Sequence, residues 1–310
     1  MADMLLQAAA TVPLAAWLVV ALLLVLLLVV TQSLWVIGPT QVGLVRKRYG
    51  RKRLEDGNPV ALDGAAGYQA ELLTAGLRFK PWPLYTVTRH PMVQIPAGQI
   101  GVVIAQVGKP LPIGAKSATY KPGFGSFQDI RAFMTNGGEK GVQRTVLPPG
   151  TVAAIHPVGF LVVSLNAVYG VPVTGEYARL LQAGNNRLTH ESFGLSEQQL
   201  MVVRIEPDAA DDGRLVDMIG IVTTLEGSPS PRGAIANRLG DFADIAQLEA
   251  DPATRNSDLA EALLGSKNDT HNNYQDFQAF LDAGGRIGLQ HDPLLYGASL
   301  LSGVFVTNFV

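Results

Sequence analysis

The run LAAWLVVALLLVLLLVV at residues 14–30 decides how this chain is built. Every residue in the run is apolar, and no charged residue occurs between Met4 and Val45. A helix needs about 20 consecutive apolar residues to cross the hydrocarbon core of a bilayer. The sequence therefore predicts a single helix that crosses a membrane near the N-terminus.

The residues on either side of the run set the expected ends of this helix. Pro13 suits the first turn of a helix, where its missing N–H has no intrahelical acceptor. Trp17 and Trp35 stand near the two ends, where indole rings favour the boundary between water and lipid. We expect a transmembrane helix over residues 13–38 and a short extracytoplasmic N-terminus over residues 1–12.

A cleaved signal peptide and a buried core helix are the two alternatives for the run. A signal peptide has a basic N-terminal region, a shorter apolar core and a cleavage site between small residues. This N-terminus instead carries Asp3 and neither Lys nor Arg before the run. A core helix of a soluble protein is seldom apolar all round for so long. The composition favours a membrane anchor over both.

Basic residues follow the run closely, and they indicate its orientation. They are Arg46, Lys47, Arg48, Arg51, Lys52 and Arg53. The excess of cations on this side predicts a cytoplasmic body and a single-pass membrane protein. We expect the same six side chains to contact anionic headgroups. A flank that only stops translocation, with no lipid specificity, explains them equally well and is the simpler interpretation.

Composition excludes several classes of function for the 310-residue chain. Apolar residues make up 47% and charged residues 16%, which is unlike a disordered chain. The net charge of −2 gives no basic field for a nucleic acid. The chain has no cysteine, so disulfides and thiol catalysis are excluded.

A pseudo-repeat follows the anchor. The pattern Gln-aliphatic-Gly-aliphatic-Val-x-x-x-x-Gly occurs at residues 41–50 and again at residues 99–108. Each occurrence is followed by a glycine turn, a short apolar run and a proline. We assign structural turns to Gly43, Gly101, Gly76, Gly150 and Pro157, because glycine permits backbone conformations that other residues avoid. Residues 39–173 are expected to form a β-rich region, with a short helix near residues 127–135 inside its long insertion.

The second half of the chain mixes strand and helix patterns. Strands are predicted at residues 199–205 and 218–224, and helices are predicted to begin at Asp241 and Ser257. A third helix carries an apolar stripe and ends at two glycines; the stripe is Tyr274, Phe277, Phe280 and Leu281. The predicted fold class is α+β, with an α+β region over residues 174–290 and the start of a further strand module over residues 291–310, which suggests a truncated chain.

Signatures of catalysis are missing from the sequence. It contains no Walker loop, no Gly-x-Ser-x-Gly and no His-Glu-x-x-His. A group of polar residues could converge on a metal, although structural roles fit their spacing better; these are His271, Asp276, His291 and Asp292. A hydrolase with a dispersed site would have to use Ser126 or Ser192 with a histidine. We therefore predict no catalytic residue, no cofactor and no metal.

The order of these motifs resembles the SPFH or band 7 superfamily of stomatin, prohibitin and flotillin. The residues that carry the resemblance are Val42–Val45, Gln99–Val103, Leu147–Thr151 and the corner Ile155-His156-Pro157. The segments 220–227, 264–268, 271–277 and 285–293 are similar to a bacterial flotillin-like branch of that superfamily. The resemblance extends over most of the chain after residue 39.

The resemblance implies SPFH-type mixed sheets with packed helices, and a non-enzymatic scaffold. Such a scaffold assembles with copies of itself and organises membrane proteins or lipid microdomains. A membrane-anchored regulator or binding module for a membrane protease remains an alternative. The superfamily usually continues into a long Ala/Glu-rich helical segment that drives assembly, and no coiled coil of that kind occurs in this sequence.

Overall fold

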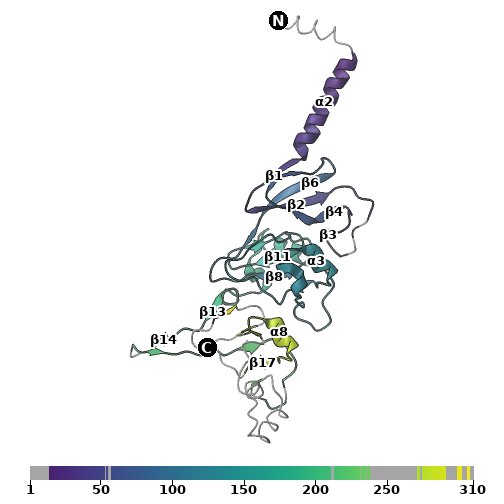
Figure 1. Cartoon of the computed structure of the whole chain (residues 1–310). Coiled ribbons are helices and arrows are strands. Elements are labelled where there is room, and N and C mark those ends of the chain that lie inside the picture. Colours follow the sequence, from purple (N-terminus) through teal and green to yellow (C-terminus); the bar gives the residue numbers. More distant parts are fainter. Residues whose placement is uncertain are drawn as a thin grey trace, which may run out of the picture. The chain divides into compact units, whose positions relative to one another are not determined.

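The computed structural model describes residues 14–52, 54, 57–210, 213–230, 232–234, 236, 237, 271, 272, 274–290, 299–301, 306 and 307. The protein is a mixed α+β structure with many short strands and few helices, as predicted (Figure 1). It divides into two compact units, Met1–Met92 and Val93–Val310. The division falls inside the predicted region 39–173, between its two pseudo-repeats.

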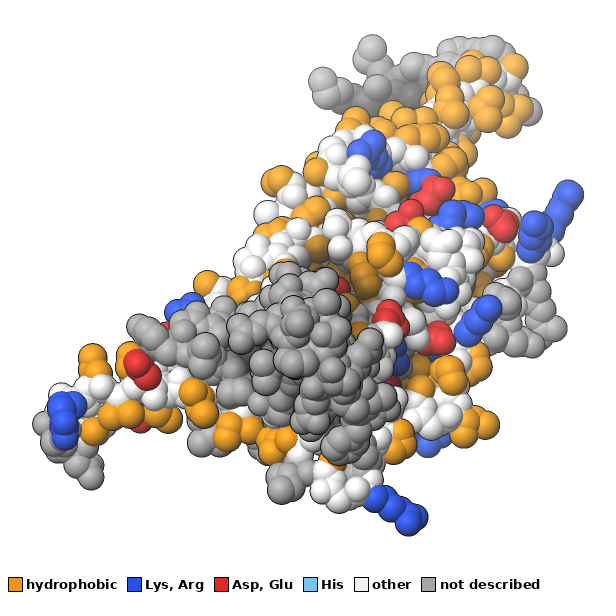
Figure 2. All heavy atoms as spheres, turned by 60° about the horizontal axis from the view of Figure 1, so that its bottom comes forward, with side chains coloured by type: hydrophobic (Ala, Val, Ile, Leu, Met, Phe, Trp, Pro, Cys, Tyr) orange, Lys and Arg blue, Asp and Glu red, His pale blue; other side chains and the backbone are white. Residues whose placement is uncertain are grey.

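The apolar run forms helix α2, Leu14–Ser33, which is long and apolar enough to cross a membrane. Figure 2 shows hydrophobic side chains covering its visible side. The helix is shorter than the predicted segment 13–38, because Leu34–Ile37 forms strand β1 instead. This strand pairs antiparallel with β5, Gly76–Phe79. Pairing with a distant strand overrides the apolar pattern that favoured a longer helix.

The first unit contains one sheet and this two-stranded ribbon. Its sheet has the order β3-β4-β2-β6. Its strands are β3 (Val60–Ala61), β4 (Gly67–Leu73), β2 (Gln41–Lys47) and β6 (Tyr85–Pro91). The ribbon packs on the sheet through a small apolar core of Ile37, Val45 and Val87. We call residues 34–91 the first copy, because the same arrangement recurs.

The second copy, residues 93–163, repeats this arrangement. Its ribbon pairs β7 with β10, and its sheet places β8 between β9 and β11. The strands are β7 (Val93–Gln94), β8 (Val102–Ala105), β9 (Gly141–Val142), β10 (Val152–Ala153) and β11 (Phe160–Val163). Strand β12, Val168–Tyr169, extends the sheet beyond β11.

The third copy, residues 202–307, was not foreseen from the sequence. Its ribbon pairs β13 with β18, and its sheet places β16 between β17 and β19. The strands are β13 (Val202–Arg204), β16 (Thr223–Thr224), β17 (Gly288–Leu289), β18 (Ser299–Leu301) and β19 (Val306–Thr307). The copy extends across the predicted boundary at residue 290.

Two short sequence signatures mark all three copies. One is Gly-aliphatic-Val-x-x-x-x-Gly, which begins at Gly43, Gly101 and Gly220. The other is Gly-x-Gln-x-x-x-Leu-x-x-Gly, which begins at Gly67, Gly141 and Gly288. The valine of the first signature is buried in each copy, at Val45, Val103 and Val222. The shared pairing and the shared signatures indicate that one β unit was used three times.

The glutamine of the second signature has the same role in each copy. The side-chain amide of Gln143 donates to the carbonyl oxygens of Glu139 and Gly141, both at 2.9 Å. Gln69 and Gln290 donate to the carbonyls four and two residues before them in the same way. The amide thus closes the bend that leads into the strand by donating to two of its backbone carbonyls.

Helix packing is shared by the second and third copies. Helices α3 (Ile130–Thr135) and α8 (Phe277–Asp282) lie in the matching segments 128–143 and 275–290, which share Gln-Asp-x-x-Ala-Phe-x-x-x-Gly-Gly-x-x-Gly-x-Gln. An aspartate caps each helix by accepting from the backbone three residues later. Phe133 and Phe280 are buried against Gly138 and Gly285, where an added Cβ would stand 2.5 Å and 2.4 Å from the ring. The predicted helices at residues 127–135 and 274–281 thus occur in shorter form.

The remaining described elements connect the copies or project from them. They are η1 (Pro122–Phe127), α4 (Gly175–Ala183), η2 (His190–Phe193), η3 (Gln198–Leu200), β14 (Asp208–Ala209) and β15 (Leu215–Val216). Strands β14 and β15 pair antiparallel with each other. The predicted strands 199–205 and 218–224 are shortened to β13 and β16. The helices predicted to begin at Asp241 and Ser257 lie outside the described residues.

Candidate functional site

The C-terminal end of α2 is fixed to the first copy by hydrogen bonds. The carbonyl oxygen of Ser33 accepts from the backbone N–H of Lys80 at 2.9 Å. The hydroxyl oxygen of Ser33 accepts from the backbone N–H of Trp82, also at 2.9 Å. Ser33 is fully buried. The helix therefore meets the β unit at a hydrogen-bonded junction, and no flexible linker separates them.

Lys47 and Arg48, two of the predicted cations, lie at this same end of the first copy. Strand β1 leads away from the junction, and β2 then runs back, pairing Lys47 with Tyr85. The backbone N–H of Arg48 donates to the carbonyl of Leu84 at 2.9 Å, two residues after Trp82. The returning strand thus brings Lys47 and Arg48 back to the end of the first copy that meets the helix.

The six cations differ in how free their side chains are. Arg46 lies with its guanidinium carbon 5.7 Å from the centre of the Tyr68 ring. Lys47 donates to the carbonyl oxygen of Gly64 at 2.8 Å. Arg48, Arg51 and Lys52 are exposed, and Arg53 lies outside the described residues. The exposed cations are the ones able to meet anionic headgroups.

The residues assigned to structural turns have two different roles. Gly76 and Gly150 adopt φ values of +115° and +76°, so both supply the left-handed backbone of a turn. Gly43 lies inside β2 and Gly101 directly before β8, which corrects their assignment to turns. A Cβ on Gly43 would stand 2.9 Å from Ile37, and one on Gly101 would stand 2.6 Å from Ile95. These two glycines let the ribbon lie close to the sheet.

Pro157 stands at the corner that precedes β11, as expected. The backbone N–H of Phe160 donates to the carbonyl of His156 at 3.0 Å, which forms the corner. Nδ1 of His156 accepts from the backbone of Val158 and Gly159 at 3.3 Å and 3.0 Å. The His156 ring is completely buried, so it holds this turn.

The other histidines with described contacts also have local partners. Nδ1 of His271 accepts from the backbone of Tyr274 at 2.9 Å, and burial lowers the pKa of this histidine. His90 lies 3.3 Å from the hydroxyl of Thr88, and burial lowers its pKa as well. Within the described part of the chain, no group of three or more His, Cys, Asp or Glu side chains could hold a metal. His291 and Asp292 lie outside that part.

The two serines considered for a hydrolase are placed by backbone geometry. Ser192 forms a capping box with Thr189, and its hydroxyl accepts from the Thr189 backbone at 3.2 Å. Ser126 adopts φ +50° at the end of η1. A hollow of about 530 Å³ lies beside η2 and is lined in part by Arg187, His190 and Glu191.

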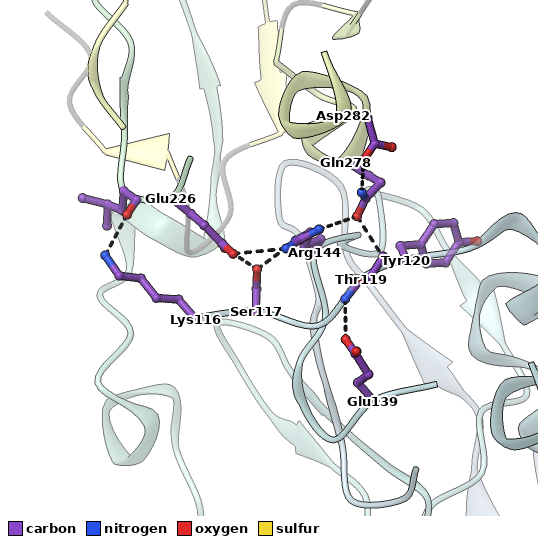
Figure 3. A network of polar contacts seen from close by, with 10 residues as sticks. Lys116, Ser117, Thr119, Tyr120, Glu139, Arg144, Glu226, Gln278 and Asp282 are labelled. Carbon is purple, nitrogen blue, oxygen red and sulfur yellow. Dashed lines mark hydrogen bonds and ion pairs between the residues drawn. The ribbon is translucent and has the colours of Figure 1, made fainter. Parts of the chain in front are cut away.

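A polar network joins the second and third copies, and sequence reasoning missed it (Figure 3). Arg144 forms an ion pair of 3.1 Å with Glu226, and both side chains are only 13% exposed. Its guanidinium also donates to Ser117 at 3.1 Å and to Gln278 at 2.7 Å. Lys116 donates to the carbonyl of Leu225 at 2.7 Å. Three segments far apart in sequence meet here, so no local pattern could indicate the site.

Comparisons with protein-family models, with curated proteins and with solved structures found no match to this chain.

Proposed function

We propose that this protein is a membrane-anchored scaffold of the SPFH type that associates with itself and organises membrane proteins or lipid microdomains. The junction at Ser33 is the observation that carries the proposal. An apolar helix of 20 residues is about 30 Å long, which equals the thickness of a bilayer core. The helix continues directly into a folded unit and presents its cations at the same end.

The repeated architecture supports a binding role over a catalytic one. Three copies of one β unit follow the anchor in sequence, and each uses its glycines, its buried valine and its glutamine to build the fold. His156 and His271 accept hydrogen bonds from backbone N–H groups two or three residues later and so hold local turns. An architecture of repeated units offers similar surfaces to several partners or to further copies of the chain.

Orientation follows from the same end of the first copy. The exposed Arg48 lies at the end of the first copy that meets the helix, and the exposed Arg51 and Lys52 follow it in the chain. Positive charge beside a transmembrane helix is retained on the cytoplasmic side. The body is therefore proposed to be cytoplasmic, with bilayer lipids and other copies of the chain as its first partners.

Co-purification of two differently tagged full-length chains from mixed membranes tests the proposal. We expect the membrane fraction to resist carbonate extraction and the two tags to be recovered together in mild detergent. The charged variant Leu24→Arg is the control for anchoring, because arginine at a helix centre costs about 3 kcal/mol of insertion free energy. A wild-type chain that is extracted by carbonate, or that is a monomer in mild detergent, contradicts the proposal.

A further inference from the structure

The ribbon of the first copy has an exposed apolar face. Alternate residues of β1 and β5 point outward, and they form the cross-strand pairs Leu34 with Phe79 and Val36 with Leu77. These four side chains are 42% to 65% exposed. The opposite face of the same ribbon supplies Ile37 to the core. An apolar row of this kind needs a partner that removes it from water.

The position of the face indicates what covers it. Leu34 directly follows Ser33, the last residue of the helix. Strands rise about 3.3 Å per residue, so Val36 lies only about 10 Å along the chain from the helix end. The headgroup region adds about 5–8 Å beyond each side of the hydrocarbon core. The face therefore begins where the bilayer core ends.

The other two copies supply an internal comparison. Val36 directly precedes the buried Ile37, and the matching positions before the buried Ile95 and Ile205 are occupied by Gln94 and Arg204. All three pair with a residue of the second ribbon strand. The same outward position is thus apolar beside the helix, neutral and polar in the second copy, and charged in the third.

We propose that the outer face of the β1–β5 ribbon lies in the lipid at the boundary between headgroups and acyl chains. The proposal rests on the membrane anchoring proposed above. Lipid is the occupant that fits best, because the face continues a helix that is itself exposed and apolar. The exposed cations at the end of β2 flank it, as basic residues flank apolar surfaces at anionic membranes.

Fluorescence quenching of labelled cysteine variants tests the proposal directly. The chain has no cysteine, so Leu77→Cys and Val152→Cys each give one labelling site. Leu77 and Val152 are 65% and 62% exposed, and both are paired at the matching outward positions of their ribbons. The full chain is labelled with a polarity-sensitive dye and reconstituted into vesicles of phosphatidylcholine and phosphatidylglycerol.

We expect spin-labelled lipids to quench the dye at Leu77→Cys several-fold more than the dye at Val152→Cys, and aqueous iodide to show the opposite order. Val36→Cys should behave like Leu77→Cys. Equal iodide quenching at both sites overturns the proposal, and so does a dye at Leu77→Cys that neither quencher reaches, which would mean that protein covers the face. Flotation with the vesicles distinguishes failure of the membrane anchoring from failure of the lipid contact. Protein that does not float overturns both proposals. Protein that floats but has an iodide-accessible dye at Leu77→Cys overturns only the lipid contact.

Discussion

Replacing Gln143 by glutamate is a sharp test of how the repeated unit is held together. The side-chain amide of Gln143 is completely buried and donates to two backbone carbonyls. Glutamate has the same shape, but a carboxylate would direct a negative charge at those two oxygens. Burial and the two nearby carbonyl oxygens both oppose ionisation of the new carboxyl group. Its pKa should therefore rise well above the usual value of about 4.3.

The expected loss of stability depends on pH. Below about pH 4 the carboxyl is protonated in both states, and its hydroxyl replaces one of the two donors. The loss is then one hydrogen bond, about 1 kcal/mol. If the folded-state pKa rises by about 3 units, a further loss of about 4 kcal/mol accumulates as pH rises from about 4.3 to about 7.3. The sign follows because a group with a raised folded pKa favours folding at low pH and loses that contribution as pH rises.

Urea unfolding of the full chain in detergent micelles, followed by circular dichroism at pH 4 and pH 8, measures this difference. Gln143→Met is the matched control, because it removes both donors and cannot ionise; its loss relative to wild type should be the same at both pH values. Gln69→Glu should show a smaller pH dependence, since Gln69 is only half-buried. A Gln143→Glu variant whose loss of stability is the same at pH 4 and pH 8 would refute the role assigned to this glutamine.

Three further predictions concern packing, charge and fluorescence. Gly138→Ala and Gly285→Ala should each lower the free energy of unfolding by about 1–3 kcal/mol, because the new methyl group meets a buried phenylalanine ring. Similar losses in urea unfolding would support the equivalence of the second and third copies. A neutral result at either site would contradict that equivalence. Arg144→Met should cost about 3 kcal/mol, because the mostly buried Glu226 loses its only cationic partner among the described residues and keeps only the Ser117 hydroxyl. Faster hydrogen exchange at residues 223–230 should report this loss, whereas unchanged exchange would mean that the network contributes little. The three tryptophans, at residues 17, 35 and 82, all lie in the first unit. Gln143→Glu in the second unit should therefore leave the tryptophan emission spectrum unchanged, whereas Gly43→Ala in the first unit should shift it to the red. A shift in Gln143→Glu alone would argue that the two units do not fold independently.

The sequence was sufficient for the apolar N-terminal helix, for the mixed α+β fold class and for the helix of the third copy. The anchor is a composition signal that needs no tertiary context, and the helix at Phe277 has a cap and a regular apolar stripe. The end of the anchor was placed too late, because Leu34–Ile37 is as apolar as the helix. Its strand conformation depends on pairing with Gly76–Phe79, which local sequence does not encode.

The third copy and the polar network could not be found in the same way. A long stretch separates β16 from β17 in the chain, so their pairing has no local signature. The signal that could have been used is the glutamine pattern, since Gly67, Gly141 and Gly288 each begin the same ten-residue motif. The ion pair of Arg144 gives no such signal, because the positions that match it in the other copies are Ala70 and His291.

Positions inside the repeated unit and positions on its outer face differ in how much they vary among the three copies. Residues that close the bend or fill the core are the same in every copy: the glutamine, the buried valine and the glycines of the two signatures. Residues that face outward differ, and they differ in a definite order. Val36 beside the helix becomes Gln94 and then Arg204 as the chain proceeds away from the anchor. An apolar residue at this position in the copy that follows the helix is what the proposed lipid contact of the first copy requires.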